Sequence, residues 1–291
     1  MADLVAFPSP GASGRPPQTR YRLTVSAVLI AGCGYVGGVL AVELLRLGHD
    51  VAALRRGDGE LPVGVQAIRA DLCDVSSLAG LPSFDTVFYL ASPDAGTSGA
   101  YRRCYLEGTR NLIDALPGTP RFFLVTSTAV YGQNDGEWVD EDSPADPTDY
   151  RGLTMLQAEE DVCSFLPATI VRFGGIYGPG RTRLIQLVER GDARCSEPVR
   201  YTNRIHRDDC AGMLAFLQAL PAPDPLYLGV DDSPVSDCDL NSWLAERLGV
   251  SPPTPVRNKT GSNKRIRNAR IRSAGYDFRY PTYREGYGPL L

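Results

Sequence analysis

The sequence has no apolar run near the roughly 20 residues that a membrane-spanning helix requires, which argues against a transmembrane protein. The formal net charge of -4 gives no basic excess, so we expect neither a nucleic-acid partner nor binding to an anionic membrane surface. Histidine occurs only twice, and no two cysteines have C-x-x-C spacing. We therefore expect no metal site.

Cysteine is present but unpatterned. The seven cysteines are odd in number and widely scattered along the chain. Such a distribution is typical of reduced thiols rather than of a disulfide framework. We accordingly expect free cysteines in a cytoplasmic protein.

Residues 7–20 are rich in proline, glycine and serine and show no periodicity, which predicts a disordered leader over residues 1–22. A signal peptide is the alternative, because Arg20 and Arg22 precede the apolar stretch 25–31. That stretch runs into closely spaced glycines rather than a cleavage site, so a β-strand is the better interpretation.

Apolar, β-branched runs alternate with helical periodicity over residues 23–180. This alternation predicts an α/β fold, with a Rossmann-type doubly wound parallel sheet. Residues 181–291 carry Pro-rich connections, and we expect them to form a small C-terminal lobe with substrate-binding elements. The expected strands cover 25–32, 49–56, 65–74, 85–92, 121–132 and 167–181. The expected helices cover 35–47, 100–116, 153–165, 184–189, 208–220 and 239–248, with an acidic loop at 133–149.

A glycine-rich turn, GCGYVG at 32–37, lies between the first expected strand and the first expected helix. In a dinucleotide-binding turn the first glycine permits the tight turn, the second lets a pyrophosphate approach the backbone, and the third lets the helix pack closely. The helix N-terminus adds free N–H groups for the phosphates. The candidate cofactor-binding residues here are Gly32, Gly34, Tyr35, Val36 and Gly37. A plain glycine turn is the alternative.

The end of the second expected strand carries Arg55 and Arg56, where an NAD-specific site usually has an acidic residue for the ribose hydroxyls. A guanidinium can pair with a 2′-phosphate, which a carboxylate would repel. We therefore expect NADP(H) as the cofactor, with NAD left open. Asp71 and Leu72, after the third strand, are expected to border the adenine.

Ser127 stands at the end of the fifth expected strand, where a hydroxyl can hydrogen-bond a substrate oxygen that changes oxidation state. A turn-capping serine is an equal alternative. After His206, we expect Asp208 and Asp209 to cap the following helix. The basic stretch 257–272 has two interpretations, a site for a phosphorylated substrate or a surface that offsets the acidic loop, and the second is preferred.

Taken in order, several motifs resemble the short-chain dehydrogenase/reductase superfamily, in its extended and atypical branch of NAD-dependent epimerase/dehydratase-like proteins. These motifs are GCGYVG (32–37), DL (71–72), YLAS (89–92), STAVYG (127–132), RFGGIYGPGR (172–181) and IHRDD (205–209). The resemblance implies that Ala91 and Ser92 line the cofactor and that Ser127 occupies the catalytic serine position.

The sequence departs from this family at its active-site pair, a Tyr followed four residues later by a Lys that lowers the Tyr pKa. Tyr150 is followed by Thr154, whereas alignment on the later Ala-Glu pair puts Arg151 and Met155 at the two positions. Tyr150 is then the remaining candidate acid/base, and we expect the helix to start after it with Asp149 as its cap.

The resemblance implies an NADP(H)-dependent oxidoreductase or epimerase/dehydratase that acts on a small polar substrate, such as a sugar derivative or a nucleotide-linked molecule. The alternative is a non-catalytic dinucleotide-binding sensor or scaffold, which the missing Lys favours. We expect the protein to be a monomer or a homodimer. The run at 263–287 is similar to the tail of one such atypical bacterial subgroup.

Overall fold

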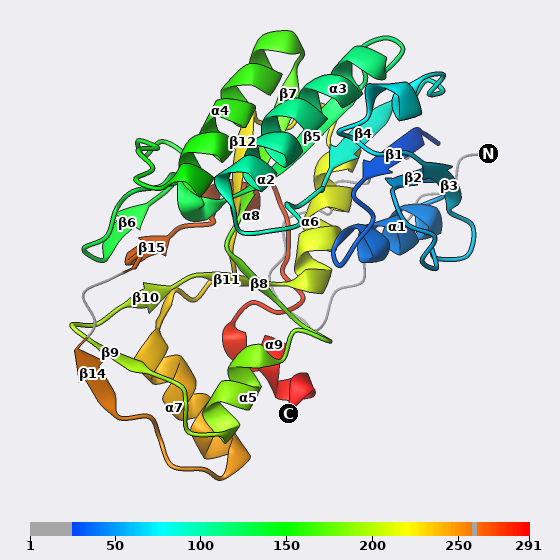
Figure 1. The fold of residues 1–291 in the computed structure, drawn as a ribbon. Helices are drawn as coiled ribbons and strands as arrows, with labels where there is room; N and C mark the ends of the chain where they lie inside the picture. The colour runs from blue at the N-terminus through cyan, green and yellow to red at the C-terminus, as the bar shows by residue number, and fades with distance from the viewer. Residues whose placement is uncertain (1–24, 258–260) are drawn as a thin grey trace.

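The computed structural model describes residues 25–257 and 261–291 (Figure 1). The leader expected at 1–22 lies outside the described residues. Within the described part of the chain, every helix is too short or too polar to cross a membrane.

A seven-stranded sheet, parallel throughout, has the order β12-β7-β5-β4-β1-β2-β3. Its strands are β1 (Ala27–Ala31), β2 (Asp50–Arg55), β3 (Gln66–Arg69), β4 (Thr86–Tyr89), β5 (Arg121–Ser127), β7 (Ala168–Phe173) and β12 (Leu226–Gly229). The chain moves outward from β1 in one direction and then returns to build the other half. This order confirms the expected doubly wound sheet.

Both faces of the sheet are buried, and β1 shows why its sequence is apolar throughout. Leu29 and Ala31 join the core on one face, while Val28 and Ile30 join the core on the other. This alternation follows from the period of two in a strand. The element α1 (Gly37–Arg46) packs against α6 (Arg207–Ala219) on the second face.

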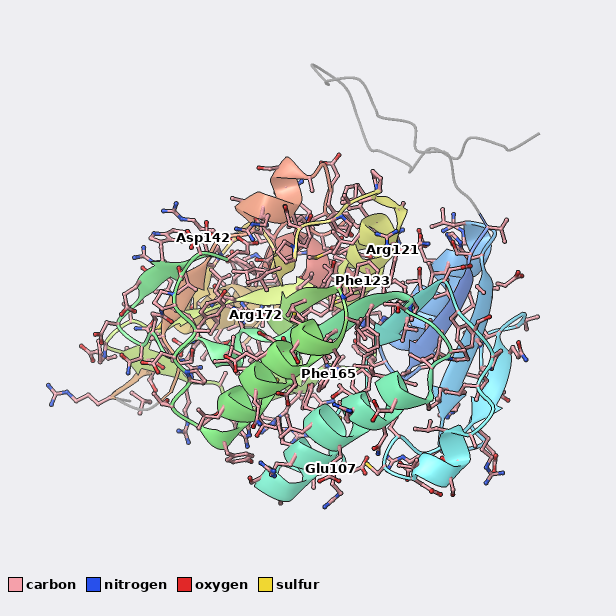
Figure 2. All side chains as sticks on the ribbon, turned by 90° about the horizontal axis from the view of Figure 1, so that it is seen from above. Glu107, Arg121, Phe123, Asp142, Phe165 and Arg172 are labelled. Atoms are coloured by element: carbon pink, nitrogen blue, oxygen red, sulfur yellow. A yellow bond between two sulfur atoms is a disulfide. The ribbon has the colours of Figure 1, made fainter. Side chains whose placement is uncertain are left out.

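The other face is covered by helices that lie between β4 and β7 in the chain. They are α2 (Ser98–Arg102), the π-helical turn η2 (Arg103–Glu107), α3 (Gly108–Ala115) and α4 (Tyr150–Phe165). Seen from above, α3 and α4 lie side by side over the sheet (Figure 2). Short 3-10 turns are η1 (Val75–Leu78), η3 (Thr128–Val130) and η4 (Gly288–Leu290).

Smaller elements form a second region with its own core around α5 and α7. The remaining elements are β8 (Gly175–Tyr177), α5 (Arg183–Glu189), β9 (Cys195–Glu197), β10 (Tyr201–Thr202), β11 (Arg204–His206), β13 (Val235–Ser236), α7 (Asp237–Leu248), β14 (Pro255–Arg257), β15 (Lys264–Ile266), α8 (Ala269–Ser273) and α9 (Tyr283–Tyr287). The expected boundary at residue 180 does not coincide with the edge of the sheet, because β12 and α6 come from beyond it and complete the layers.

The acidic stretch 133–149 was expected to be all loop, but it contains β6 (Glu137–Val139), which pairs in parallel with β15. The side chain of Arg265 donates to the Gly136 carbonyl at 2.8 Å, and Arg270 forms an ion pair with Asp142 at 2.8 Å. The basic stretch therefore contacts the acidic one, but Lys264 is buried, so the stretch is not simply a solvated surface. A strand this short leaves no periodic signal, so only its distant partner defines it.

The start of α6 corrects a second expectation. The N-cap is His206, whose Nδ1 accepts from the Asp208 backbone N–H at 3.2 Å, and neither aspartate caps the helix. Asp209 is fully buried and accepts from the Tyr276 hydroxyl and from the backbone N–H groups of Arg279 and Tyr280. It therefore fastens the C-terminal segment to α6.

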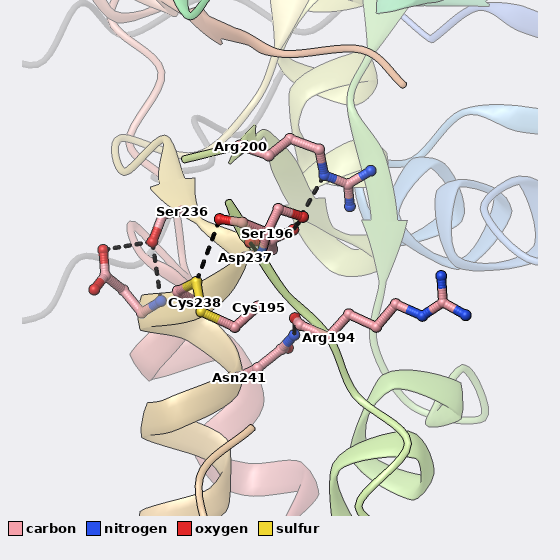
Figure 3. The surroundings of a disulfide bond; sticks show 9 residues. Arg194, Cys195, Ser196, Arg200, Ser236, Asp237, Cys238 and Asn241 are labelled. Carbon is pink, nitrogen blue, oxygen red and sulfur yellow. Dashed lines mark hydrogen bonds and ion pairs between the residues drawn. A yellow bond between two sulfur atoms is a disulfide. The ribbon is translucent and has the colours of Figure 1, made fainter. Parts of the chain in front are cut away.

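A disulfide joins Cys195 in β9 to Cys238 in the first turn of α7, which corrects the expectation that all cysteines are free (Figure 3). Asp237 accepts from the Ser196 backbone N–H at 3.0 Å and from the Arg200 side chain at 3.1 Å. These bonds hold β9 against the helix start and so bring the two cysteines together. Their separation of 43 residues hides the pairing in the sequence.

We predict that thiol titration of the denatured, unreduced protein finds five free cysteines of the seven. Replacing both Cys195 and Cys238 with Ser should lower the free energy of unfolding by about 4 kcal/mol, the loop-closure value for a loop of this length. Urea denaturation of both proteins measures the difference. Seven titratable thiols before reduction would restore the original expectation.

Asp231 follows β12 and is 1% exposed, beside the side chains of Arg204 and Tyr177. Its Oδ1 accepts from the Ser233 backbone N–H at 3.1 Å, whereas its Oδ2 is buried without a hydrogen-bond partner among the described residues. Burial raises the pKa of this carboxyl to about 8. The folded protein therefore holds a proton there at neutral pH.

We predict that the raised pKa of Asp231 makes the free energy of unfolding fall as pH rises from about 4 to about 8. An unfolded Asp loses its proton near pH ~3.9, so the folded state binds more protons in that window. The slope for one proton is about -1.4 kcal/mol per pH unit. Asp231→Asn should remove that slope, as urea denaturation of both proteins at several pH values would measure. Parallel pH profiles would contradict the assignment.

Candidate functional site

A cleft of about 770 Å³ runs along the carboxyl ends of the parallel strands. Because parallel strands end at the same edge, residues that follow β1 to β5 and β7 meet there. The cleft is lined by every residue that the sequence suggested for the cofactor, together with the candidate serine. These are Gly32, Gly34, Tyr35, Val36, Gly37, Arg55, Arg56, Asp71, Leu72, Ala91, Ser92 and Ser127.

The turn after β1 has the geometry of a close backbone approach. Gly32 has φ +98°, and a Cβ there would lie 2.4 Å from the Ala91 backbone nitrogen. A Cβ on Gly37 would lie 2.7 Å from the Gly32 carbonyl oxygen, so α1 can pack here only without one. Val36 occupies the N-cap of α1 and supplies no side-chain acceptor. The Gly38 N–H donates to the Gly34 carbonyl at 2.9 Å, and among the described residues the N–H groups of Val36 and Gly37 have no acceptor, so these two remain available to a ligand.

Tyr35 ties this turn to the opposite wall of the cleft. Its hydroxyl donates to the Pro179 carbonyl at 3.0 Å, and the Arg181 guanidinium lies 4.1 Å from the centre of its ring. Arg181 is itself exposed and lines the cleft. The residues after β8 thus contact the glycine turn directly.

The two arginines at the end of β2 both have protein partners. Arg55 donates to the Gly59 carbonyl at 2.9 Å. Arg56 forms a two-pronged pair with Asp94, including an Nη1–Oδ2 bond of 2.8 Å. Both side chains line the cleft, so an arriving ligand meets arginines that already hold oxygen acceptors.

Asp71 and Leu72 occupy a rigid turn after β3. The Asp71 carboxylate accepts from the Cys73 backbone N–H at 2.9 Å, and the Leu72 carbonyl accepts from the Asn111 amide at 2.9 Å. Both residues line the cleft, in a turn held by these hydrogen bonds.

Ser127 ends β5 and is half-buried in the cleft wall. Its Oγ accepts from the Ala129 backbone N–H at 3.2 Å, which caps the turn η3. The capping role expected as one alternative is thus present. It does not exclude the other, because the hydroxyl hydrogen stays available to a ligand oxygen.

The helix α4 begins at Tyr150, and Asp149 is its N-cap, accepting from the backbone N–H groups of Arg151 and Gly152 at 2.9 Å. The cap is as expected, but a start after Tyr150 is wrong. The Tyr150 hydroxyl donates to the Gly96 carbonyl and accepts from the Arg151 side chain at 3.2 Å. Tyr150 lines a separate, smaller hollow on α4 rather than the cleft that holds Ser127.

A buried ion pair fixes the register of α4 against the sheet. Glu159 accepts from the Thr126 hydroxyl at 2.6 Å and from Arg172 Nε at 3.1 Å, and both charged side chains are less than a tenth exposed. Alignment on Ala158-Glu159 assigns Arg151 and Met155 to the positions of the family's Tyr and Lys, and the other register assigns Tyr150 and Thr154. Met155 is buried in the core, and Arg151 is exposed.

Sequence patterns missed several residues of the cleft. Asp94, Arg103 and Cys104 line it without belonging to a recognised motif, whereas Ile176 and Arg181 lie in the motif at 172–181, to which the sequence assigned no cofactor contact. Burial raises the pKa of the Cys104 thiol to about 12, which disfavours its thiolate form. Among the described residues, no group of three or more His, Cys, Asp or Glu side chains could hold a metal ion.

The family model and similar proteins point to epimerases and dehydratases. The model of the NAD dependent epimerase/dehydratase family matches residues 28–199. A solved structure from Methylobacillus flagellatus, provisionally described as an NAD-dependent epimerase/dehydratase, is 39% identical, covers 92% of this chain and 98% of that one, and has a TM-score of 0.80. MoeE5, solved with UDP-glucuronic acid and NAD, is 26% identical, covers 90% and 96% of the two chains, and has a TM-score of 0.73.

Among curated proteins, the UDP-glucose 4-epimerase of Corynebacterium glutamicum is 29% identical over 168 residues, which is 52% of this chain and 51% of that protein. The chain spans about half the length of the curated relatives that it matches. The family match covers more than half of the 291 residues and includes the glycine turn and Ser127. The chain therefore belongs to the NAD-dependent epimerase/dehydratase family, within the extended short-chain dehydrogenase/reductases.

Proposed function

We propose that this chain is an enzyme of the epimerase/dehydratase type, which binds a nicotinamide dinucleotide in the cleft and acts on a nucleotide-linked sugar derivative. The main support for this proposal is that the glycine turn and Ser127 line the same cleft. The substrate class is taken from MoeE5, solved with UDP-glucuronic acid and UDP-glucose, and from the UDP-glucose 4-epimerases.

The glycine turn fits the pyrophosphate of such a cofactor. A Cβ on Gly34 would meet no heavy atom within 4 Å, in contrast to Gly32 and Gly37. Gly34 therefore leaves open space above the backbone at the start of α1, as a phosphate requires. We further propose NADP(H) as the preferred form, because Arg55 and Arg56 stand at the end of β2 where NAD-specific sites carry an acid.

The chemistry divides between the cofactor and the cleft wall. A nicotinamide ring supplies the capacity to take and return a hydride. The Ser127 hydroxyl, held by its bond to the Ala129 N–H, would donate to the substrate oxygen beside it. We propose Tyr150 as the acid/base, which requires its hydroxyl to leave the Gly96 carbonyl and turn toward Ser127.

A non-catalytic dinucleotide sensor is the second candidate. Two observations favour it. When the chain is aligned on Ala158-Glu159, Arg151 and Met155 take the positions of the family's Tyr and Lys. A guanidinium stays protonated and cannot exchange protons. Tyr150 is also the first residue of α4, so no loop absorbs the offset of one position, which is about 100° of helix rotation.

We predict that Gly34→Ala folds normally but loses dinucleotide binding. The added Cβ finds open space in the folded protein, yet it stands where a phosphate would approach the backbone. Thermal unfolding should match the unchanged protein, while fluorescence titration should show NADPH affinity reduced by at least tenfold. Gly32→Ala is the contrast, because it clashes with backbone at a positive φ and should lower the melting temperature. Unchanged NADPH affinity in Gly34→Ala would move the phosphate site elsewhere.

We predict that Ser127→Ala lowers the kcat for a UDP-sugar substrate by roughly 100-fold, the lower end for a group that assists proton transfer. Tyr150→Phe should abolish turnover, and NADPH affinity should be unchanged in both variants. Tyr101→Phe is a matched control, because that ring contacts Tyr150 edge-on at 5.6 Å and does not line the cleft. Turnover that survives in Tyr150→Phe would remove Tyr150 from the mechanism. NADPH binding without turnover of any UDP-sugar would favour the sensor.

A further inference from the structure

An ion pair crosses the cleft at its β2 end. Arg56 follows β2, and Asp94 follows β4. The guanidinium and the carboxylate meet through two hydrogen bonds, with Nη1–Oδ2 at 2.8 Å, and their side chains are 56% and 60% exposed. Both residues line the cleft, so this pair belongs to its wall.

The order of the strands places this pair over the glycine turn. In the sheet, β1 lies between β2 and β4, and the glycine turn follows β1. A contact between the residues after β2 and after β4 must therefore span the edge from which that turn emerges. A ligand that lies on the glycine turn and extends toward β2 meets the Arg56–Asp94 pair on its way.

Arg103 adds a second positive charge near the same carboxylate. It lies in the π-helical turn η2, where the Cys104 carbonyl accepts from the buried Tyr89 hydroxyl and the Arg103 carbonyl accepts from the Gly108 N–H. Single π-helical turns within helices are frequent at functional sites. The Arg56 hydrogen bonds, and secondarily the charge of Arg103, lower the pKa of Asp94. Asp94 is therefore an anion at every physiological pH.

We propose that Asp94 is a specificity-determining residue of this cleft, because its carboxylate competes with a ribose 2′-phosphate for the Arg56 guanidinium. The proposal rests on the proposed dinucleotide function of the cleft. A carboxylate and a phosphate make the same two-pronged contact with an arginine, so they exclude each other there. A neutral 2′-hydroxyl meets no such competition.

This competition sets the balance between the two forms of the cofactor. Arg56 alone would favour NADP(H) strongly, whereas Arg56 already held by Asp94 favours it less. An exposed ion pair is weak, so a ligand phosphate can displace the carboxylate at small cost. Asp94 thus moderates a preference that the arginines establish.

The test measures binding of four ligands to the full chain by titration calorimetry. These are NADPH, NADH, and the adenosine-end fragments 2′,5′-ADP and 5′-ADP. In Asp94→Asn, NADPH and 2′,5′-ADP should bind roughly fivefold more tightly, a change of the size that an exposed ion pair contributes. NADH and 5′-ADP should bind with unchanged affinity.

Asp58→Asn is the matched control. Asp58 forms an ion pair at 2.9 Å with Arg69, the last residue of β3. Both side chains are more than 70% exposed, and neither residue lines the cleft. This variant removes the same charge from the same edge and should leave the ratio of NADPH to NADH affinity unchanged. An equal change in both variants would reduce the effect to net charge and overturn the proposal.

The Arg56→Ala background separates competition from repulsion. If Asp94 acts through Arg56, then Asp94→Asn should have no effect on the affinity ratio once Arg56 is absent. A ratio that still changes in that background, or one that never changes, would overturn the role of Asp94 while dinucleotide binding stands. Failure of the unchanged protein to bind all four ligands would instead overturn the proposed function, and this inference with it.

Discussion

The parallel direction of β2, β1, β4, β5 and β7 is the constraint on which the site depends. Parallel strands send all their carboxyl ends to one edge, so residues far apart in the sequence meet there without any contact of their own. The reversal of strand order between β1 and β4 leaves the cleft at that edge. The glycine turn, the arginines after β2 and Ser127 share one cleft because the sheet brings them together.

The helix on the other side of Ser127 is held by a different kind of force. Glu159, Thr126 and Arg172 form a buried polar network that joins α4 to β5 and β7. Removing one partner would leave a buried charge alone, which is costly, so the network fixes the register of the helix. A Cβ on Gly152 would lie 2.5 Å from the Ala129 carbonyl oxygen, so α4 can pack this closely against the residues after β5 only because position 152 is glycine. The position of Arg151 and Met155 is thus set by packing, and the departure from the family's pair is a real feature of this chain.

How much the sequence predicts depends on how local the signal is. Six strands of the seven-stranded sheet and the residues of the glycine turn have local patterns, and their places agree with the structure, whereas the seventh strand, β12, was not expected from the sequence. The pairing of β6 with β15 and the bond between Cys195 and Cys238 join segments that carry no local signal, and only the assembled fold reveals them. Asp94 belongs to the same class, because its importance lies in a partner 38 residues earlier. The expected start of α4 is wrong because Asp149 is the N-cap and Tyr150 directly follows it as the first helical residue. The sequence indicated the cap but not the exact first residue of the helix.

The C-terminal segment has a consequence for how this chain comes to be folded during synthesis. Lys264 donates to the Tyr131 carbonyl, β15 pairs with β6, and Arg279 reaches back to Glu43 at 3.1 Å across 236 positions. A ribosome synthesises these partners more than 100 residues after α1 and β6, so those two elements emerge before the residues that bind them. Contacts of such long range are slow to form, and until they do the nascent chain exposes unpaired strand edges. The position of residues 264–279 in the sequence therefore affects the order in which the contacts form, as well as which contacts form.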